Sequence, residues 1–251
     1  MADLTRILLV EDNDRFGKAA CNYLKSRNLS VDRAASYVPA ADQLQGVRYA
    51  GALIDCFFPT LTGSDDTDLG KLTIDKMFAT DSRAQRIEEY EQAFSEFMDL
   101  TDPEFKKIVR YIGSISTESP EKNPVVGAFR NVSELNRDLT AFLMKKHAQD
   151  YLKGLDQFKD YFPALRKALE ENPLNQPLGI LIAEQAEEKR IPFVLVTSTY
   201  HHDILTQPIQ DYCQRRKWTL IDCYQGKEDE KATPEFWQIA YETLKNQMDK
   251  K

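Results

Sequence analysis

Three short segments of the chain are nearly unbroken runs of apolar residues, and they constrain the fold more than any other feature. They are RILLV at 6–10, AGALI at 50–54, which continues as DCFF to residue 58, and PFVLVT at 192–197. Apolar runs of this length without polar alternation are typical of strands that are buried on both faces, as in parallel sheets. We therefore predict that these segments form the interior of a parallel β-sheet.

Helical patterns alternate with the strands. A fourth strand is predicted at 218–224, and a weaker candidate at 29–34 brings the number of predicted strands to five. Helices are predicted between and after the strands, at 14–27, 39–45, 178–189, 204–216 and 234–248. This alternation predicts an α/β fold: a doubly wound five-stranded parallel sheet with helices on both faces.

A long segment interrupts the alternation between residues 64 and 176. Its apolar residues recur at mostly three- and four-residue steps in three stretches, which predicts at least three amphipathic helices. The segment is too long to be an unstructured loop in a compact domain. We therefore divide the chain into an α/β domain, 1–63 and 177–251, and an inserted all-helical subdomain, 64–176.

The charge and the cysteine content argue against several functional classes. With 33 Lys and Arg against 40 Asp and Glu, the 251-residue chain has a formal net charge of −7, which disfavours binding to nucleic-acid phosphates. The four cysteines lack the close spacing of a zinc site, and we expect them to be reduced and buried. We see no secretory signal pattern and no apolar run that could cross a bilayer, so we expect a cytoplasmic protein without a membrane partner.

Acidic residues directly follow two of the predicted strands. Glu11 and Asp12 come after the strand at 6–10, and Asp55 comes after the strand at 50–54. In a doubly wound sheet, the carboxyl ends of neighbouring strands meet at the edge where ligands bind. Three carboxylates at one edge repel one another, and a hard divalent cation such as Mg²⁺ relieves that repulsion. The sequence therefore predicts a Mg²⁺ site at these residues.

A hydroxyl group is expected at the same edge, because the strand at 192–197 ends in Thr197, followed by Ser198. Phosphoryl transfer depends mainly on positioning and on charge neutralisation. A carboxylate, a bound Mg²⁺ and a hydroxyl donor therefore suit phosphoryl transfer onto Asp55.

These motifs, in this order, resemble the receiver domain of two-component response regulators. The matching residues are the acidic pair Glu11-Asp12 after the first strand, Asp55 with Pro59 and Gly63 at the spacing of the family's D-x-x-[M]-P-x-x-x-G motif, and Thr197-Ser198 after the fourth strand. Phe58 stands in the place of the usual Met. The resemblance covers about residues 5–63 and 177–245 and does not include the insertion.

The resemblance implies a flavodoxin-like fold and a role for each matching residue. Asp55 would be the phosphoacceptor, and Mg²⁺ would be held by Glu11, Asp12, Asp55 and the backbone carbonyl of Phe57. The Thr197 hydroxyl would engage the phosphoryl group. The phosphoryl donor would be a histidine kinase or a phosphotransfer protein, and a homodimer is a further candidate assembly.

The chain departs from the family after the fifth strand. The family carries a Lys there, usually followed by Pro, which pairs with the phosphoryl charge, but no Lys-Pro follows 218–224. Lys227 is the nearby candidate, and Tyr224 then stands where the family's switch aromatic would. If Cys223 occupies the lysine position instead, the phosphorylation switch is incomplete.

We therefore expect a signalling protein rather than an enzyme, with phosphorylation of Asp55 and output through protein–protein contact. One alternative is a phosphorylation-independent binding module, which keeps the receiver fold and has lost the strand-five lysine. Another is a phosphohydrolase that resembles the haloacid dehalogenases, with the insertion as a cap. Against the phosphohydrolase, Phe57 replaces the second Asp of that family's D-x-D motif, which removes its usual general acid/base.

Overall fold

The computed structural model describes residues 5–81, 161–200, 205–224 and 226–250. The central part of the predicted insertion, 82–160, lies outside the described residues. Residues 1–81 and 160–251 belong to one compact unit.

The described strands form the predicted parallel sheet, which confirms the doubly wound α/β fold. The strands are β1 (Arg6–Val10), β2 (Ser30–Ala34), β3 (Gly51–Asp55), β4 (Phe193–Val196) and β5 (Leu220–Ile221). Their order in the sheet is β2-β1-β3-β4-β5, with every neighbouring pair parallel, as in flavodoxin-like folds. The predicted strand at 218–224 is thus reduced to two residues, which lie at the edge of the sheet and are only partly buried.

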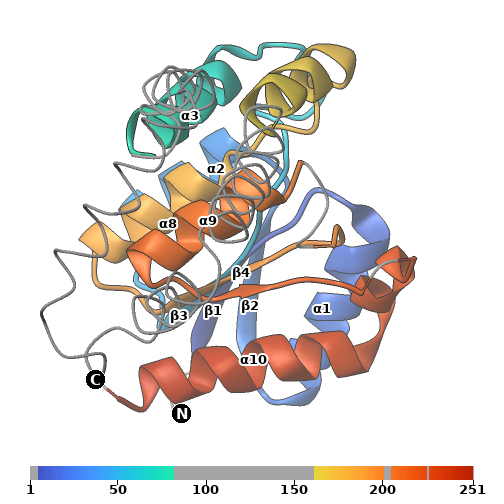
Figure 1. The fold of residues 1–251 in the computed structure, drawn as a ribbon. Coiled ribbons are helices and arrows are strands. Elements are labelled where there is room, and N and C mark those ends of the chain that lie inside the picture. Colours follow the sequence, from blue (N-terminus) through green and yellow to red (C-terminus); the bar gives the residue numbers. More distant parts are fainter. Residues whose placement is uncertain (1–4, 82–160, 201–204, 225, 251) are drawn as a thin grey trace, which may run out of the picture. The chain divides into compact units, whose positions relative to one another are not determined.

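Helices cover both faces of the sheet (Figure 1). On one face lie α1 (Asp14–Ser26) and α10 (Pro234–Met248), and on the other lie α2 (Tyr37–Gly46), α8 (Gly179–Glu188) and α9 (Gln207–Arg216). Among the described residues, no helix combines the length and the apolar character that crossing a membrane requires.

Side-chain caps define where α1 and α10 begin. The Asn13 side chain accepts hydrogen bonds from the backbone N–H groups of the first turn of α1, and Thr233 does the same for α10. Such caps satisfy N–H groups that have no partner within the helix. Both helices start close to the carboxyl edge of the sheet, so these caps also fix the backbone next to that edge.

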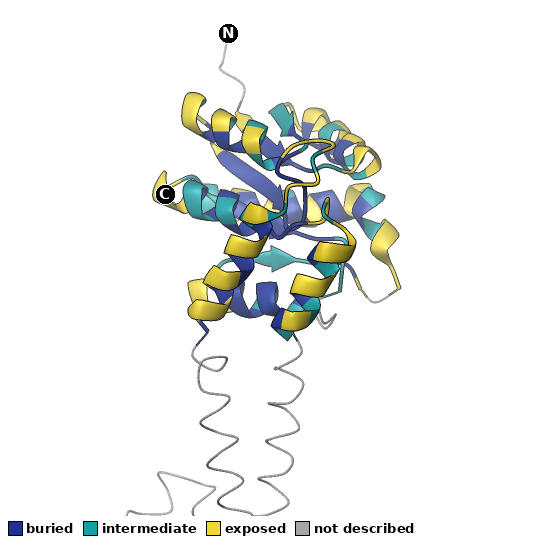
Figure 2. Cartoon of the chain, turned by 90° about the horizontal axis from the view of Figure 1, so that it is seen from above, coloured by how far each residue is buried: buried dark blue, intermediate teal, exposed yellow. Residues whose placement is uncertain are grey.

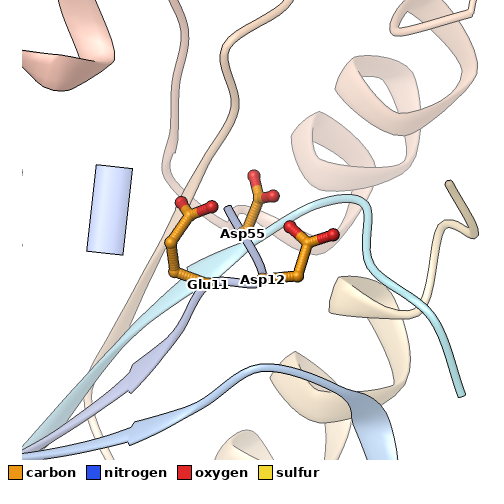
Figure 3. Close-up of side chains that lie close together, drawn as sticks. All are labelled: Glu11, Asp12 and Asp55. Carbon is orange, nitrogen blue, oxygen red and sulfur yellow. The ribbon is translucent and has the colours of Figure 1, made fainter. Parts of the chain in front are cut away.

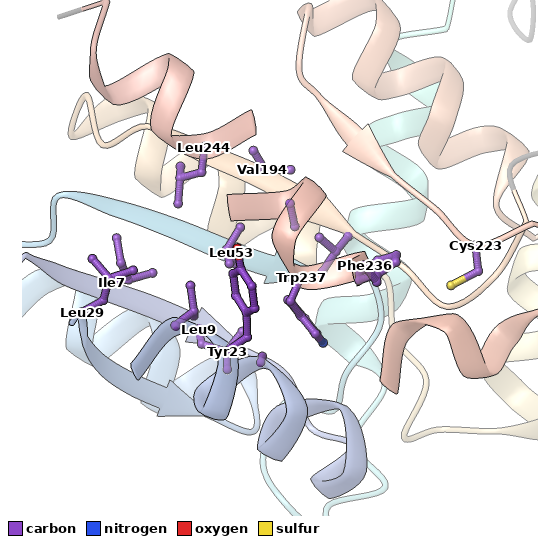
Figure 4. Packing of buried hydrophobic residues seen from close by; sticks show 14 residues of the cluster. Ile7, Leu9, Tyr23, Leu29, Leu53, Val194, Cys223, Phe236, Trp237 and Leu244 are labelled. Atoms are coloured by element: carbon purple, nitrogen blue, oxygen red, sulfur yellow. The ribbon is translucent and has the colours of Figure 1, made fainter. Parts of the chain in front are cut away.

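The core lies between the apolar strands and the inner faces of the helices. Strands β1, β3 and β4 are almost entirely buried, whereas β2 and β5 are mostly of intermediate burial, and in Figure 2 the helices expose their outer faces. Figure 4 shows the cluster between the sheet and the α1/α10 face, where Ile7, Leu9 and Leu53 meet Trp237 and other buried residues. Trp237 is fully buried, and its indole N–H donates a 2.7 Å hydrogen bond to the backbone carbonyl of Lys231.

The compact unit extends into the segment that the sequence pattern assigned to the insertion. Helix α3 (Asp68–Ala79) and the helical residues 161–171 both belong to it. The rings of Phe78 and Phe162 meet edge to face, with 5.4 Å between their centroids, and Arg166 pairs with Asp75. These two helical segments therefore pack on each other at the base of the insertion.

A buried glutamine, Gln176, ties this base to the end of β3. Its side-chain amide donates to the Asp66 carbonyl at 2.6 Å, and its side-chain oxygen accepts from the Gly70 N–H at 3.1 Å. Its backbone carbonyl accepts from the N–H of Phe58 at 3.0 Å. Gln176 therefore connects the start of α3 to the segment that directly follows Asp55.

Candidate metal centre

Three carboxylates meet at the carboxyl edge of the sheet, as predicted. Glu11 and Asp12 directly follow β1, and Asp55 ends the neighbouring strand β3. One ligand atom from each of the three lies within 4.8 Å of the others. In Figure 3 the three carboxylates point to the same side of the strand ends. The chain continues from β1 to α1 on one face of the sheet and from β3 to helices that include α8 on the other, and doubly wound folds bind ligands at such a point.

A lysine that the sequence analysis missed completes the cluster. The ammonium nitrogen of Lys231 lies 2.7 Å from Asp55 Oδ1 and 2.6 Å from Glu11 Oε2. Its side chain is only 1% exposed. Lys231 comes from the 3₁₀ helix η2 (Glu228–Ala232), which lies between β5 and α10, and the hydrogen bond from Trp237 holds its backbone.

Lys227, the lysine that the sequence favoured, does not reach Asp55. Its side chain is 61% exposed, and its ammonium nitrogen lies 3.2 Å from Glu230 Oε1 and over the ring of Tyr224. Tyr224 is itself 69% exposed. The chain passes Lys227 on the outside of the unit and turns inward only through η2, so Lys231 is the lysine that arrives at the site.

The nearby Cys223 does not stand in for the lysine either. It is buried, and its sulfur lies 4.0 Å from the carbonyl oxygen of Glu228. The sequence held no signal that separates Lys231 from Lys227, because both lie in the connection between the last predicted strand and Pro234, which opens α10.

The cluster carries more negative than positive charge, and its pKa values reflect this excess. Burial, together with the neighbouring carboxylates, raises the pKa of Asp55 to about 8 although Lys231 opposes the rise. Burial and Glu11 raise the pKa of Asp12 to about 6. Burial would lower the pKa of Lys231, but Asp55 and Glu11 raise it above its ordinary value. The raised pKa values mean that Lys231 stays charged while Asp55 and Asp12 resist ionisation.

This donor set fits a hard divalent cation. When all three carboxylates are ionised, as a bound cation would favour, they and the Lys231 ammonium carry a net charge of −2, which one Mg²⁺ would neutralise. Carboxylate oxygens are the ligands that Mg²⁺ takes in proteins. Glu11, Asp12 and Asp55 can thus hold such an ion, with the identity of the metal left to experiment.

The segment that carries the Phe57 carbonyl lies at the same edge. The N–H of Cys56 donates to the carbonyl of Val196 in β4, and the N–H of Phe58 donates to Gln176. Phe57, between these two anchored residues, has a buried side chain. Its backbone is therefore held just beyond Asp55.

Thr197 follows β4, whose last residue, Val196, pairs with Asp55. The Thr197 side chain is buried, and its hydroxyl oxygen lies 2.8 Å from that of Thr199. The Thr199 hydroxyl lies in turn 2.5 Å from that of Thr206. The predicted hydroxyl is thus at the right edge of the sheet, within a chain of threonines.

Comparison with known proteins gives no match to a family model, a curated protein or a solved structure. The strand order and the three carboxylates show a flavodoxin-like α/β fold with an acidic cluster that resembles a receiver phosphorylation site.

Proposed function

We propose that this protein is a receiver-like signalling protein in which Asp55 accepts a phosphoryl group in a Mg²⁺-dependent reaction. The observation that carries the proposal is the buried contact of Lys231 with Asp55 and Glu11, beside the third carboxylate of Asp12. This set supplies the nucleophile, the oxygen ligands for a cation and a fixed positive charge. The sequence alone favoured Lys227 as the source of the positive charge, with Cys223 as the alternative occupant of the lysine position.

In the proposed reaction, a carboxylate oxygen of Asp55 attacks the phosphorus of a phosphohistidine or of a small acyl phosphate. A new P–O bond forms while the bond from phosphorus to the leaving group breaks, and the electron pair of that bond stays with the leaving group. Mg²⁺ held by Glu11, Asp12, Asp55 and the Phe57 carbonyl would neutralise charge on the phosphoryl oxygens. The Lys231 ammonium then exchanges its contact with Asp55 Oδ1 for a phosphoryl oxygen.

Thr197 has a matching role in the proposal. Its hydroxyl exchanges the Thr199 partner for a phosphoryl oxygen once Asp55 is modified. The exchange would change the conformation of the segment that begins at Thr197. A partner protein that contacts this segment would then bind more or less tightly. The phosphoryl donor in this scheme is a histidine kinase or a phosphotransfer protein.

One observation favours a second candidate, a binding module that works without phosphorylation. The Asp55 side chain is only 10% exposed, and the Lys231 ammonium already contacts one of its oxygens. A phosphoryl donor can reach Asp55 only if Lys231 and the other residues that bury this carboxylate move aside. If they do not move, the cluster serves as a structural ion pair beneath a binding surface.

The experiment that separates these functions is the intact mass of the protein after incubation with acetyl phosphate, with and without Mg²⁺. We expect one phosphoryl adduct that needs Mg²⁺ and that is lost in Asp55→Asn. An unmodified protein with the donor intact would support the binding module. Consumption of the donor without a lasting adduct would support a phosphohydrolase.

A further inference from the structure

A half-buried arginine, Arg33, holds the backbone of the loop that carries two of the three acidic residues. Arg33, near the end of β2, donates from Nε to the Glu11 carbonyl at 2.9 Å and from Nη2 to the Asp12 carbonyl at 3.0 Å. Its third nitrogen, Nη1, donates to Asp14 Oδ1 at 2.9 Å. One guanidinium thus contacts both acidic residues of the loop and the first residue of α1.

The way α1 packs shows that this placement is built into the fold. Arg33 lies across Gly17, where a Cβ would be 2.5 Å from the Arg33 Cζ and 3.0 Å from its Nη2. A glycine inside a helix costs about 1 kcal/mol relative to alanine. Gly17 therefore destabilises α1 as an isolated helix, and the Arg33 guanidinium fills the space where a larger side chain would lie.

We infer that Arg33 is a positioning residue for the metal centre, an inference that rests on the proposed Mg²⁺ site. Its planar fork fixes the Glu11 and Asp12 backbone, and so their carboxylates are held in place before the cation arrives. Residues that orient metal ligands typically change metal affinity about 10–100-fold when they are removed. Lysine cannot replace this fork, because its ammonium is a single point charge.

The test is the Mg²⁺ affinity of the full chain, measured by titration calorimetry with Mg²⁺ alone. We expect Arg33→Ala to raise the Kd about tenfold, the lower end for such residues, because Arg33 binds ligand backbones rather than ligand oxygens. Arg33→Lys should not restore the affinity. Arg6→Ala is the matched control: Arg6 also pairs from a strand with an aspartate, Asp32, but at the opposite end of β1.

A second variant separates positioning from charge and from fold stability. Gly17→Ala keeps Arg33 in the sequence and favours the helix, but its new methyl group displaces the guanidinium. It should therefore raise the Kd for Mg²⁺ while leaving the unfolding midpoint in EDTA unchanged or higher. In the double variant, which combines Gly17→Ala with Arg33→Ala, the new methyl group has no guanidinium to displace. Its Kd for Mg²⁺ should therefore equal that of Arg33→Ala alone.

The outcomes distinguish this inference from the proposed function. If the wild-type protein binds no Mg²⁺, the metal centre is wrong and the inference falls with it. If the wild type binds Mg²⁺ and both Arg33→Ala and Gly17→Ala bind it equally well, the metal centre stands and the positioning role of Arg33 is refuted. A lower stability in EDTA with an unchanged Kd would also refute it, because that is the result of a purely structural role.

Discussion

At the scale of single residues, the main feature is one buried ammonium among three carboxylates. Lys231 contacts Asp55 and Glu11 at ion-pair distance while almost fully buried. Removing one partner of a buried ion pair is far more damaging than removing an exposed one, because the remaining charges lose their compensation. We therefore expect substitution of Lys231 to change the free energy of unfolding far more than substitution of Lys227, four residues earlier.

Lys231→Met should lower the free energy of unfolding by about 3–5 kcal/mol in the absence of metal, because the buried carboxylates of Glu11 and Asp55 then lose the cation that they contact. Lys227→Met should change it by less than about 0.5 kcal/mol, as expected for an exposed residue. Urea unfolding in EDTA measures both. Equal effects of the two variants would contradict the placement of Lys231 in the cluster.

The raised pKa of Asp55 predicts a pH dependence of stability with a definite sign. The unfolded chain loses this proton near pH 3.8, whereas the folded protein keeps it until about pH 8. Between these values the folded state binds more protons than the unfolded state, so the contribution of Asp55 to stability falls as the pH rises. The contribution of Asp12 to stability also falls as the pH rises, up to about pH 6, because its pKa is raised as well.

To measure this contribution, the wild type and Asp55→Asn are unfolded in EDTA from pH 5 to pH 8. The difference between their free energies of unfolding gives the contribution of Asp55 at each pH. The wild type should lose on the order of 1–3 kcal/mol relative to the variant over this range. Saturating Mg²⁺ should abolish the loss, because the cation favours the ionised carboxylates. A difference that stays flat in EDTA would mean that Asp55 is already ionised in the apoprotein.

At the scale of the elements, the start of α8 presses directly on the residue that ends β3. The N–H of Gly179 donates to the Cys56 carbonyl at 3.1 Å. A Cβ at Gly179 would lie 2.8 Å from the Cys56 Cα and would overlap the Asp55 carbonyl oxygen. Because these are backbone atoms, they cannot move aside without shifting Asp55 itself.

Gly179→Ala should therefore lower the free energy of unfolding by about 1–3 kcal/mol, the usual cost of overpacking. Gly46→Ala, in α2, is the matched control, because a Cβ there meets no atom within 4 Å. It should be neutral or stabilising by up to about 1 kcal/mol. If urea unfolding gave the same free energy for both variants, the close contact between α8 and β3 would be refuted.

At the scale of the whole molecule, the sequence was sufficient to predict the parallel sheet but not which helices outside the regular alternation pack beside it. Unbroken apolar runs identified β1, β3 and β4, and the acids at the ends of β1 and β3 followed from parallel topology. Helix α3 and residues 161–171 lie within 64–176, which the sequence pattern assigned to the insertion. An amphipathic pattern does not show which surface a helix packs on, so the sequence could not assign these helices to the α/β unit.

Lys231 was hidden for a related reason. The length of a connection between a strand and a helix is not encoded by local periodicity, so the turn of η2 between Lys227 and Lys231 was not foreseen. The unbalanced charge of the cluster was hidden as well, since it depends on which cation reaches the acids. The positions of Glu11, Asp12 and Asp55 were predictable, whereas their electrostatics required the assembled unit.

The central claim is that Asp55 is the residue that accepts a phosphoryl group, and locating the modification tests it most directly. The protein is incubated with acetyl phosphate and Mg²⁺, digested, and its peptides are analysed by mass spectrometry at a pH that preserves acyl phosphates. We predict a phosphoryl group on the peptide that contains Asp55, present only when Mg²⁺ is added. An adduct on another peptide, or none at saturating donor and Mg²⁺, would contradict the claim.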